Sequence, residues 1–422
     1  MNLPLLIAFA GLLLVWSLLS ARVERLDLSG PIVFVLVGFV LCNGPTQVLE
    51  LSVETTAVHG LAELTLVLLL FADASRVDSR DLRLSAGFPI RLLAIGLPLT
   101  MALGFGLAAA LFTDLPWELA ALLGAVLAPT DAALSAAVVS DESIPAKVRR
   151  ALNVESGLND GIATPLVTGF LAASTVLLGV GSVEGQASRP GVAALTDLGG
   201  GVVIGVALGY LGGLAVVAAG SRGWIAHGDR RVAVLTLPLL AFFVSQQAGV
   251  NYFVAAFVAG LAFRAALKVD DEEAVELPEL LGRVLSLAVW FAFGAGLLVY
   301  GLEVADWRIA LYAVLSLSAV RMVPVALSLV GSGVDRRTSI FIGWFGPRGL
   351  ASVVFGLLIV EELPPGDPGV QTITSAIVLT ILLSVICHGV SARPLAAWIA
   401  RDGRAEADSD ESPIRARRPL HG

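Results

Sequence analysis

The sequence predicts an all-α, polytopic membrane protein with about thirteen transmembrane helices. Three observations predict this class: the composition, the spacing of the long apolar runs, and the distribution of Lys and Arg among the loops. The 422 residues are 56% hydrophobic and only 15% charged, whereas a soluble domain carries about 25% charged residues. The mean hydropathy is +0.86. Neither a nucleic-acid partner nor an enzymatic activity is expected, and membrane lipid is the expected surroundings.

The apolar runs define the predicted spans, because about 20 apolar residues cross the ~30 Å hydrocarbon core of a bilayer. They are residues 3–20, 29–43, 57–74, 86–113, 117–140, 148–179, 193–220, 231–248, 251–267, 279–301, 306–331, 336–361 and 370–392. The first run has no basic residues before it, so a cleaved signal peptide is not expected. Residues 1–400 are predicted to form the transmembrane domain, and the charged residues 401–422 a disordered cytoplasmic tail.

Lys and Arg follow every second span. Basic residues occur after spans 1, 3, 5, 7, 9, 11 and 13, whereas the opposite loops contain only Arg189 and Arg308. Loops rich in Lys and Arg are normally cytoplasmic. The alternation therefore predicts a cell-membrane protein whose N-terminus is outside and whose C-terminus is in the cytoplasm. That topology requires an odd number of spans.

Spans 5 and 12 are each interrupted by a proline among polar residues, in APTD (128–131) and GPRG (346–349). Proline removes a backbone donor, and a broken helix is tolerated in lipid only where the break faces protein or water. Two broken spans at corresponding positions of the two halves are typical of inverted-repeat transporters. The predicted repeats are about 1–179 and 231–400, with a linker helix at about 193–220. Two unrelated proline kinks are the alternative.

Span 6 carries polar side chains on one face, because residues four apart on a helix are neighbours. These side chains are Glu155, Ser156, Asn159 and Asp160. Asp160 lies ~18 Å along span 6 from the inside, near the membrane midplane. Asp131 lies ~21 Å along span 5 from the outside, at a similar depth. Ionisable groups at that depth are costly, and each indicates a functional site.

A carboxylate without a fixed partner can bind a proton or a metal cation, and each excludes the other. Na⁺, like Ca²⁺, is a hard cation that prefers oxygen ligands. The predicted oxygens are the Asp160 carboxylate, the Ser156 hydroxyl, the Asp131 carboxylate directly or through water, and the carbonyl freed at Thr130. Because Asn159 beside Asp160 is neutral, one titrating carboxylate predicts electroneutral one-for-one exchange. A polar network that only holds two helices together is the alternative.

Two arginines, Arg321 and Arg348, lie well inside predicted spans and must find partners there. We expect Arg321 of span 11 to pair with Glu155, which removes Glu155 from titration. Arg348 is expected to contact carbonyls at the span 12 break or the Asp131 region, although the reverse assignment of the two arginines stays open. Asp73, at the end of span 3, is either an ion ligand on the access path or an ordinary helix-end carboxylate.

Other residues provide no further chemistry. Cys42 and Cys387 are isolated in apolar runs without metal-like spacing. The four His residues are scattered, so a histidine proton relay is not expected. No cofactor is expected.

The chain resembles the monovalent cation:proton antiporters of the CPA1 family, the NhaP-like bacterial relatives of eukaryotic sodium/proton exchangers. The resemblance lies in the combination of APTDAAL, NVESGLNDG, Arg321 and WFGPRGLAS. The resemblance covers residues 1–400. It implies a thirteen-helix homodimer in which a core bundle moves against a dimerisation scaffold. Its implied carrier is Asp160, with Asp131 and Asn159 as neighbours. It also implies that Thr130 and Ser156 are ligands and that Glu155 and Arg321 form a stabilising bridge.

The sequence departs from the family at two places. Asp73 stands where many relatives have Glu, and Ala132 stands where many continue with Pro.

We expect alternating-access exchange of a monovalent cation, with Na⁺ ahead of K⁺ or Li⁺, for H⁺, in pH and cation homeostasis. The rival interpretations are a proton-coupled transporter of another solute, a cation channel and a membrane enzyme. A single asymmetric midplane site disfavours a channel, and the few aromatic residues disfavour a transporter of another solute. The two intramembrane arginines have no role in a membrane enzyme of the kind considered.

Overall fold

The structure is a computed structural model that describes residues 3–24, 28–44, 56–77, 87–131, 134, 141, 143–180, 190–267 and 272–410. Over these residues the chain is entirely helical and turn-forming, with no strand. Nine helices in this part of the chain are long and apolar enough to cross a membrane, and three shorter ones are also apolar. The prediction of an all-helical membrane fold is therefore confirmed.

While most of the second half of span 5 falls outside the described residues, the described helices lie at the predicted spans, either singly or as consecutive pieces. They are α1 (Leu3–Glu24), α2 (Gly30–Asn43), α3 (Thr56–Arg76), α5 (Phe88–Arg91), α6 (Leu97–Leu111), α7 (Trp117–Val126), α9 (Ala146–Leu177), α10 (Pro190–Ser221), α11 (His227–Ala248), α12 (Tyr252–Leu267), α13 (Glu276–Ala292), α14 (Leu298–Leu302), α15 (Trp307–Leu317), α16 (Ala319–Ser328), α17 (Arg336–Trp344), α18 (Leu350–Glu362) and α19 (Pro368–Asp410). The π-helical turns η1 (Leu92–Gly96) and η3 (Phe293–Leu297) connect α5 to α6 and α13 to α14, and the 3-10 turn η2 (Glu272–Val275) precedes α13.

Spans 5 and 12 are broken where the prolines indicate. Helix α7 ends at Val126, and the run 127–131 beyond it is not helical. Helix α17 ends at Trp344 and α18 begins at Leu350, which leaves 345–349 non-helical. The amide of Asp131 donates to the carbonyl of Pro347 at 2.9 Å, so the two breaks lie side by side in the interior.

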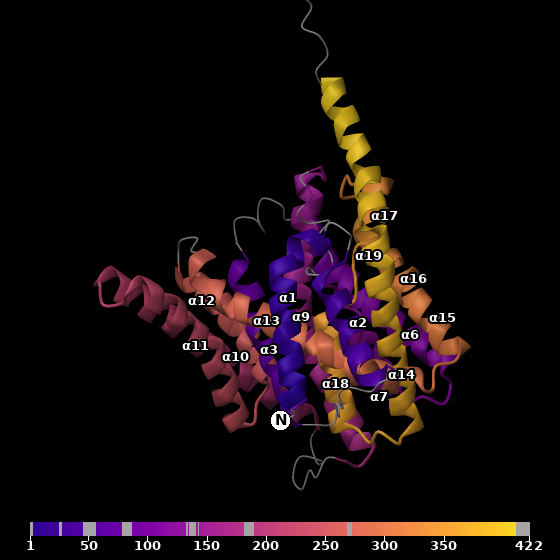
Figure 1. Ribbon diagram of the computed structural model, residues 1–422, viewed down its shortest axis with the longest axis horizontal. Helices are drawn as coiled ribbons and strands as arrows, with labels where there is room; N and C mark the ends of the chain where they lie inside the picture. Colours follow the sequence, from indigo (N-terminus) through magenta and orange to yellow (C-terminus); the bar gives the residue numbers. More distant parts are fainter. Residues whose placement is uncertain are drawn as a thin grey trace, which may run out of the picture.

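The helices form two groups that stand beside each other in Figure 1. In the first group, α3, α10, α11, α12 and α13 pack mainly with one another. In the second group, α6, α7, α15, α16, α17 and α19 do so, and α9 and α18 have their most extensive contacts with α7 and α19. The other faces of α9 and α18 contact α3 of the first group, and α9 also contacts α12. Helices α9 and α18 therefore border the joint between the groups.

Helices α10 and α12 of the first group approach each other at backbone distance. Glycines of α10 at every fourth position face α12, and a Cβ added to them would fall 2.2–2.7 Å from atoms of α12 or of Asn251 just before it, three of which are backbone carbonyl oxygens. These glycines are Gly201, Gly205, Gly209 and Gly213. Small residues at such spacing let membrane helices pack closely. We call this contact the glycine seam.

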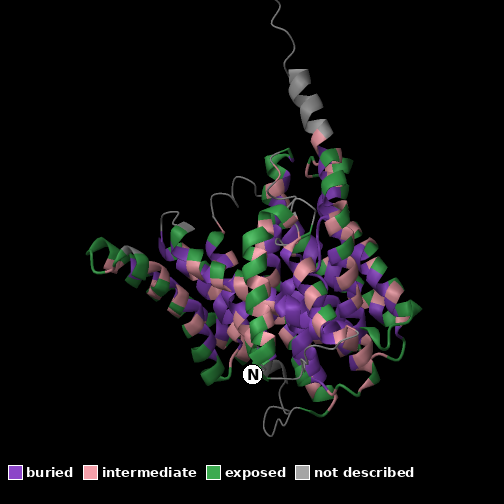
Figure 2. Ribbon diagram, in the orientation of Figure 1, coloured by how far each residue is buried: buried purple, intermediate pink, exposed green. Residues whose placement is uncertain are grey.

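Burial follows the membrane assignment. The centre of the molecule is buried, while the outer faces of α1, α10 and α11 are exposed (Figure 2). Large apolar side chains are exposed on these faces, including Leu18 at 73% and Val203 at 68%. Exposed apolar helix faces of this extent are compatible with contact with lipid.

The end of the chain differs from the sequence prediction. Helix α19 continues to Asp410, so the first ten residues of the segment predicted to be disordered are helical. The run RDGRAEADSD contains several good helix formers and no proline, which explains why the helix continues. Residues 411–422 lie outside the described residues.

Candidate functional site

Helix α9 carries the polar face predicted for span 6. Glu155, Ser156 and Asn159 are buried, and Asp160 is partly buried. Because the side chains of 155 and 159, and of 156 and 160, are one turn apart, all four lie along the side of α9 that meets the neighbouring helices.

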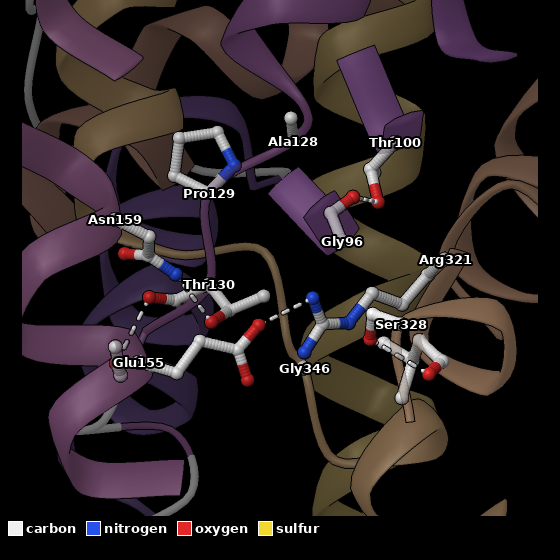
Figure 3. Close-up of polar contacts among 12 residues, drawn as sticks. Gly96, Thr100, Ala128, Pro129, Thr130, Glu155, Asn159, Arg321, Ser328 and Gly346 are labelled. Carbon is white, nitrogen blue, oxygen red and sulfur yellow. Dashed lines mark hydrogen bonds and ion pairs between the residues drawn. The ribbon is translucent and has the colours of Figure 1, made fainter. Parts of the chain in front are cut away.

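The broken span 5 meets this face at Thr130. The Ser156 hydroxyl donates to the Thr130 carbonyl at 2.9 Å, and the Asn159 amide nitrogen donates to the Thr130 hydroxyl at 2.7 Å (Figure 3). The break leaves the Thr130 carbonyl without an intrahelical partner, and an unpaired buried carbonyl is costly. Ser156 meets that need, so the two antiparallel spans are joined at the predicted place.

Asp131 connects the break in span 5 to the half-helix α18. Its carboxylate oxygen Oδ2 accepts from the amide of Leu350, the first residue of α18, at 2.9 Å. An acidic side chain at this position satisfies an unpaired helix amide and interacts favourably with the helix dipole. Asp131 therefore acts as a cap of α18 here, a role that the sequence analysis did not anticipate beside its predicted part in ion binding.

Asp160 differs from Glu155 and Asp131 in having no direct partner for its carboxylate within the described part of the chain. Among the described residues, no hydrogen bond or ion pair to its carboxylate is found; only its backbone carbonyl accepts, from Thr164 at 2.6 Å. Its charge lies close enough to those of Asp131 and Asp73 to interact with them. A partly buried carboxylate beside two like charges has a strong tendency to take up a cation or a proton.

Asp73 of α3 lies against α9. A Cβ added to Gly157 would fall 3.8 Å from the Asp73 Cβ, and the Asp73 side chain is partly buried. Gly157 is one turn from Asp160 on the side of the predicted cytoplasmic loops. The structure thus places Asp73 beside the polar face of α9, and both its contact with an ion and an ordinary helix-end role beside Arg76 stay predictions.

Glu155 pairs with Arg321, the pairing predicted from the sequence. The Arg321 Nη1 atom lies 2.6 Å from Glu155 Oε1, and both side chains are 2% exposed (Figure 3). Within the described residues, Glu155 Oε2 and the Nε and Nη2 atoms of Arg321 have no other hydrogen-bond partner. Each of these two charges therefore depends on the other.

Arg348 is completely buried and contacts carbonyls rather than a carboxylate. Its Nη1 atom donates to the carbonyl of Ala128 at 3.1 Å, and with longer bonds of 3.4 Å to those of Pro129 and Gly346. Its Nη2 atom donates to the carbonyl of Ser316 at 3.2 Å. One guanidinium thus satisfies carbonyls at both breaks, since its planar fork offers five donors.

Several supporting residues were missed by the sequence analysis. The Ser384 hydroxyl accepts from the amide of Arg348 at 2.7 Å, and Ser352 donates to the carbonyl of Val126 at 2.7 Å. His388 Nε2 lies 2.8 Å from the carbonyl of Trp344, the last residue of α17. Ser384 and His388 are four apart in an apolar span, and that spacing was the available signal.

The acids do not form a preformed metal centre. No group of three or more His, Cys, Asp or Glu side chains close enough to hold a metal ion occurs in the described part of the chain. A cation at Asp160 would therefore need hydroxyl and carbonyl oxygens, such as those of Ser156 and Thr130, among its ligands.

Replacing Gly349 with Ala is expected to separate the two breaks. A Cβ at Gly349 would fall 2.0 Å from Asp131 Oδ2, so the methyl group must displace the cap of α18. Overpacking of this kind costs about 1–3 kcal/mol, measurable as a lower thermal unfolding midpoint in detergent. Gly356→Ala is the matched control on the same helix, because its Cβ would meet only side-chain atoms at 3.4 Å. Equal midpoints for the two variants would contradict the close approach.

Comparison with known proteins adds the following. The sequence profile of the family described as sodium/hydrogen exchanger, transmembrane, matches residues 9–398. The chain is 28% identical over 323 residues to a Na(+)/H(+) antiporter of Schizosaccharomyces pombe, covering 69% of this chain and 67% of that protein. It is 26% identical over 378 residues to the K(+)/H(+) antiporter NhaP2 of Shewanella baltica, covering 89% and 63%. The chain thus spans about two thirds of the length of these relatives.

The fold is also similar to that of a solved structure. The sodium proton antiporter MjNhaP1 from Methanocaldococcus jannaschii, solved at pH 8, superposes with a TM-score of 0.75 and 21% sequence identity. The match covers 95% of this chain and 100% of that one. At this identity the likeness concerns the fold.

Proposed function

This chain belongs to the sodium/hydrogen exchanger family, and from that premise we propose that it exchanges a monovalent cation for H⁺ across the membrane by alternating access. The observation that carries the proposal is Asp160, an acid near mid-span that no hydrogen bond or ion pair from the described residues engages. The names of the relatives support the substrate class, since one is a Na(+)/H(+) antiporter and another a K(+)/H(+) antiporter.

Asp160 is the proposed carrier. Asp160 is neutral with a proton bound, and the carboxylate and a bound cation are neutral together. Binding either ion therefore removes the cost of a buried charge. Repulsion from Asp131 and Asp73 favours the proton-bound and the cation-bound forms over the free carboxylate. The proton and the cation compete for one carboxylate. Exchange results because the site crosses in one direction with the cation bound and in the other with the proton bound.

The supporting roles follow from the contacts. Thr130, Ser156 and Asp131 are the proposed further oxygens for the cation, and Asn159 holds Thr130 in place. Glu155 with Arg321, and Arg348 with the carbonyls at the breaks, stabilise the site and take no direct part in the exchange. Asp73 is the proposed ligand on the cytoplasmic approach to Asp160.

Exchange is proposed to be electroneutral. Among the described residues, the acids that interact with Asp160 are Asp131, which caps α18, and Asp73, which lies one turn away toward the predicted cytoplasmic side. One carboxylate can carry either one cation or one proton. Each cycle then moves one positive charge in each direction.

The wider organisation is proposed as follows. Residues 1–400 form the transport domain, with repeats at about 1–179 and 231–400, and the second helix group moves against the first. The chain works as a homodimer in the cell membrane, with its N-terminus outside and its C-terminus in the cytoplasm. Its physiological role is pH and cation homeostasis.

The test uses purified protein in liposomes with an imposed ΔpH and a pH-sensitive dye. We expect Na⁺ to dissipate the gradient, with K⁺ and Li⁺ run in parallel to rank the cations. Clamping the membrane potential at different values should leave the initial rate unchanged if exchange is one for one. A gradient that no monovalent cation dissipates would refute the exchange proposal, and a rate that follows the clamp would refute electroneutrality alone.

A further inference from the structure

A charged cluster lies at the proposed cytoplasmic end of the first helix group, just beyond Asp73. Arg76 is the last residue of α3, and it meets Glu279 in the first turn of α13. The Arg76 Nη1 atom donates to Glu279 Oε1 at 2.9 Å, and its Nη2 atom donates to Glu279 Oε2. Glu279 Oε1 also accepts from Arg283 Nη2 at 2.7 Å. The two parallel bonds fix the direction of the Arg76 guanidinium, because its planar fork matches a carboxylate.

Asp73 lies one turn before Arg76 on the same helix. Side chains three residues apart on a helix are neighbours, and opposite charges at that spacing attract each other. The charge of Arg76 acts on Asp73 more strongly than those of Asp131 and Glu279 do. Even so, no residue that the structure describes makes a hydrogen bond or an ion pair with the Asp73 carboxylate. Arg76 is thus bonded to an acid on another helix instead of to its neighbour.

The position of Glu279 explains this choice of partner. The Arg76 side chain is 46% exposed and that of Glu279 is 16% exposed, so the guanidinium keeps much of its contact with water while it makes two bonds. Turning toward the partly buried Asp73 would remove more of that water, which is costly for a charge. Because α3 and α13 both belong to the first helix group, the proposed movement of the second group leaves the contact in place.

We propose that Glu279 is a positioning residue for the exchange: by holding Arg76, it keeps Asp73 available to a monovalent cation that approaches Asp160 from the cytoplasm. The proposal deepens the proposed function and rests on it, because it presumes that Asp73 is a ligand on that approach. Without Glu279, Arg76 turns to Asp73, and a cation must then displace a guanidinium. Glu279 acts through Arg76 and is not itself a ligand.

A plain tether between α3 and α13 is the competing explanation of the same contact. A tether would affect stability and the maximal rate, and it would be lost equally when either partner is replaced. The positioning role predicts instead that loss of Glu279 is harmful only while Arg76 is present. A double variant that lacks both side chains therefore separates the two roles.

The test measures how exchange depends on the cation concentration at the cytoplasmic face. Everted membrane vesicles, from a host without its own cation/proton antiporters, expose that face to the medium. Dissipation of ΔpH is followed with a pH-sensitive dye over a range of Na⁺ concentrations, or of K⁺ if the liposome assay ranks K⁺ first. This yields a KM and a maximal rate. The variants are Glu279→Gln, Arg76→Gln, and Glu279→Gln combined with Arg76→Gln or with Arg283→Gln.

In Glu279→Gln we expect the KM for the cation to rise by roughly two- to fivefold, the factor typical of an exposed ion pair, with the maximal rate unchanged. Adding Arg76→Gln should return the KM to the parental value, although the contact between α3 and α13 is still missing. Adding Arg283→Gln should not, because Arg283 is not among the charges that act on Asp73. An unchanged KM in Glu279→Gln would overturn the proposal, as would a double variant without Arg76 that stays equally impaired.

Glu276→Gln is the matched control. It removes the same charge one turn earlier on α13, where Glu276 pairs with Arg231 of α11 at 3.1 Å, and its KM should be parental. A rise in KM equal to that of Glu279→Gln would show that the total charge of this face matters rather than the direction of Arg76, and would also overturn the proposal. Parental vesicles without any response to cations would instead contradict the exchange function itself, so the two failures are distinguishable.

Discussion

Asp160→Asn is expected to reduce cation-dependent ΔpH dissipation to the level of protein-free liposomes. The amide keeps the shape of the side chain but can neither release a proton nor balance the charge of a cation. The thermal unfolding midpoint should stay the same or rise, because the substitution removes repulsion among Asp160, Asp131 and Asp73. Loss of exchange with retained stability separates a carrier from a structural residue.

Asp229→Asn is the matched control for this variant. It makes the same substitution at an exposed position of α11 and should exchange at the parental rate. Substantial exchange by Asp160→Asn would show that another group carries the proton. In that event Asp73 and Asp131 are the next acids to replace, since they are the charges that interact with Asp160.

Glu155→Gln is expected to produce the largest loss of stability, about 3–5 kcal/mol. Arg321 is 2% exposed at its side chain, and Glu155 is the carboxylate that pairs with it at 2.6 Å. The substitution leaves a buried guanidinium without a counter-charge. Thermal unfolding in detergent measures the loss, and the fraction of correctly folded protein during purification should fall with it.

A second substitution distinguishes loss of the pair from loss of packing. Arg321→Met in the Glu155→Gln background removes the orphaned charge, so the double variant should be more stable than Glu155→Gln alone. The coupling of the two sites in a double-mutant cycle should be large because the residues are in direct contact. Additive effects of the two substitutions on stability would mean that the ion pair contributes little. A change in exchange stoichiometry in Glu155→Gln would instead make Glu155 a second carrier.

Local rules predicted much of the site. Pro129 and Pro347 mark helix breaks because proline cannot donate within a helix, and both breaks occur there. The helical spacing of Glu155, Asn159 and their neighbours placed them on one face, and the cost of an isolated intramembrane charge predicted a partner for Arg321. Each of these inferences needs only the local sequence and the properties of the bilayer.

The rest depended on which segments meet in three dimensions. That Asp131 caps α18, or that Arg348 contacts Ala128, requires the register between spans distant in sequence. The Arg76–Glu279 pair could not be found from the sequence for the same reason, since 203 residues separate its members. The π-helical turns η1 and η3 insert a residue into apolar helices; Arg91 and Pro98 flank η1, whereas no Pro or charged residue marks η3.

The glycine seam and the contact between Phe257 of α12 and Gly161 of α9 have different mechanical consequences. Along the seam, successive turns of α10 meet the backbone of α12, so sliding would bring carbonyls and Cα atoms into collision at every turn. At Gly161 a single ring rests on a helix that has no side chain to obstruct it. Helix α12 therefore meets α10 through backbone contacts over several turns, whereas it meets Gly161 of α9 through one side chain. If the second helix group moves against the first as proposed, α10 and α12 are expected to stay together, and rearrangement of side chains is expected between α12 and α9.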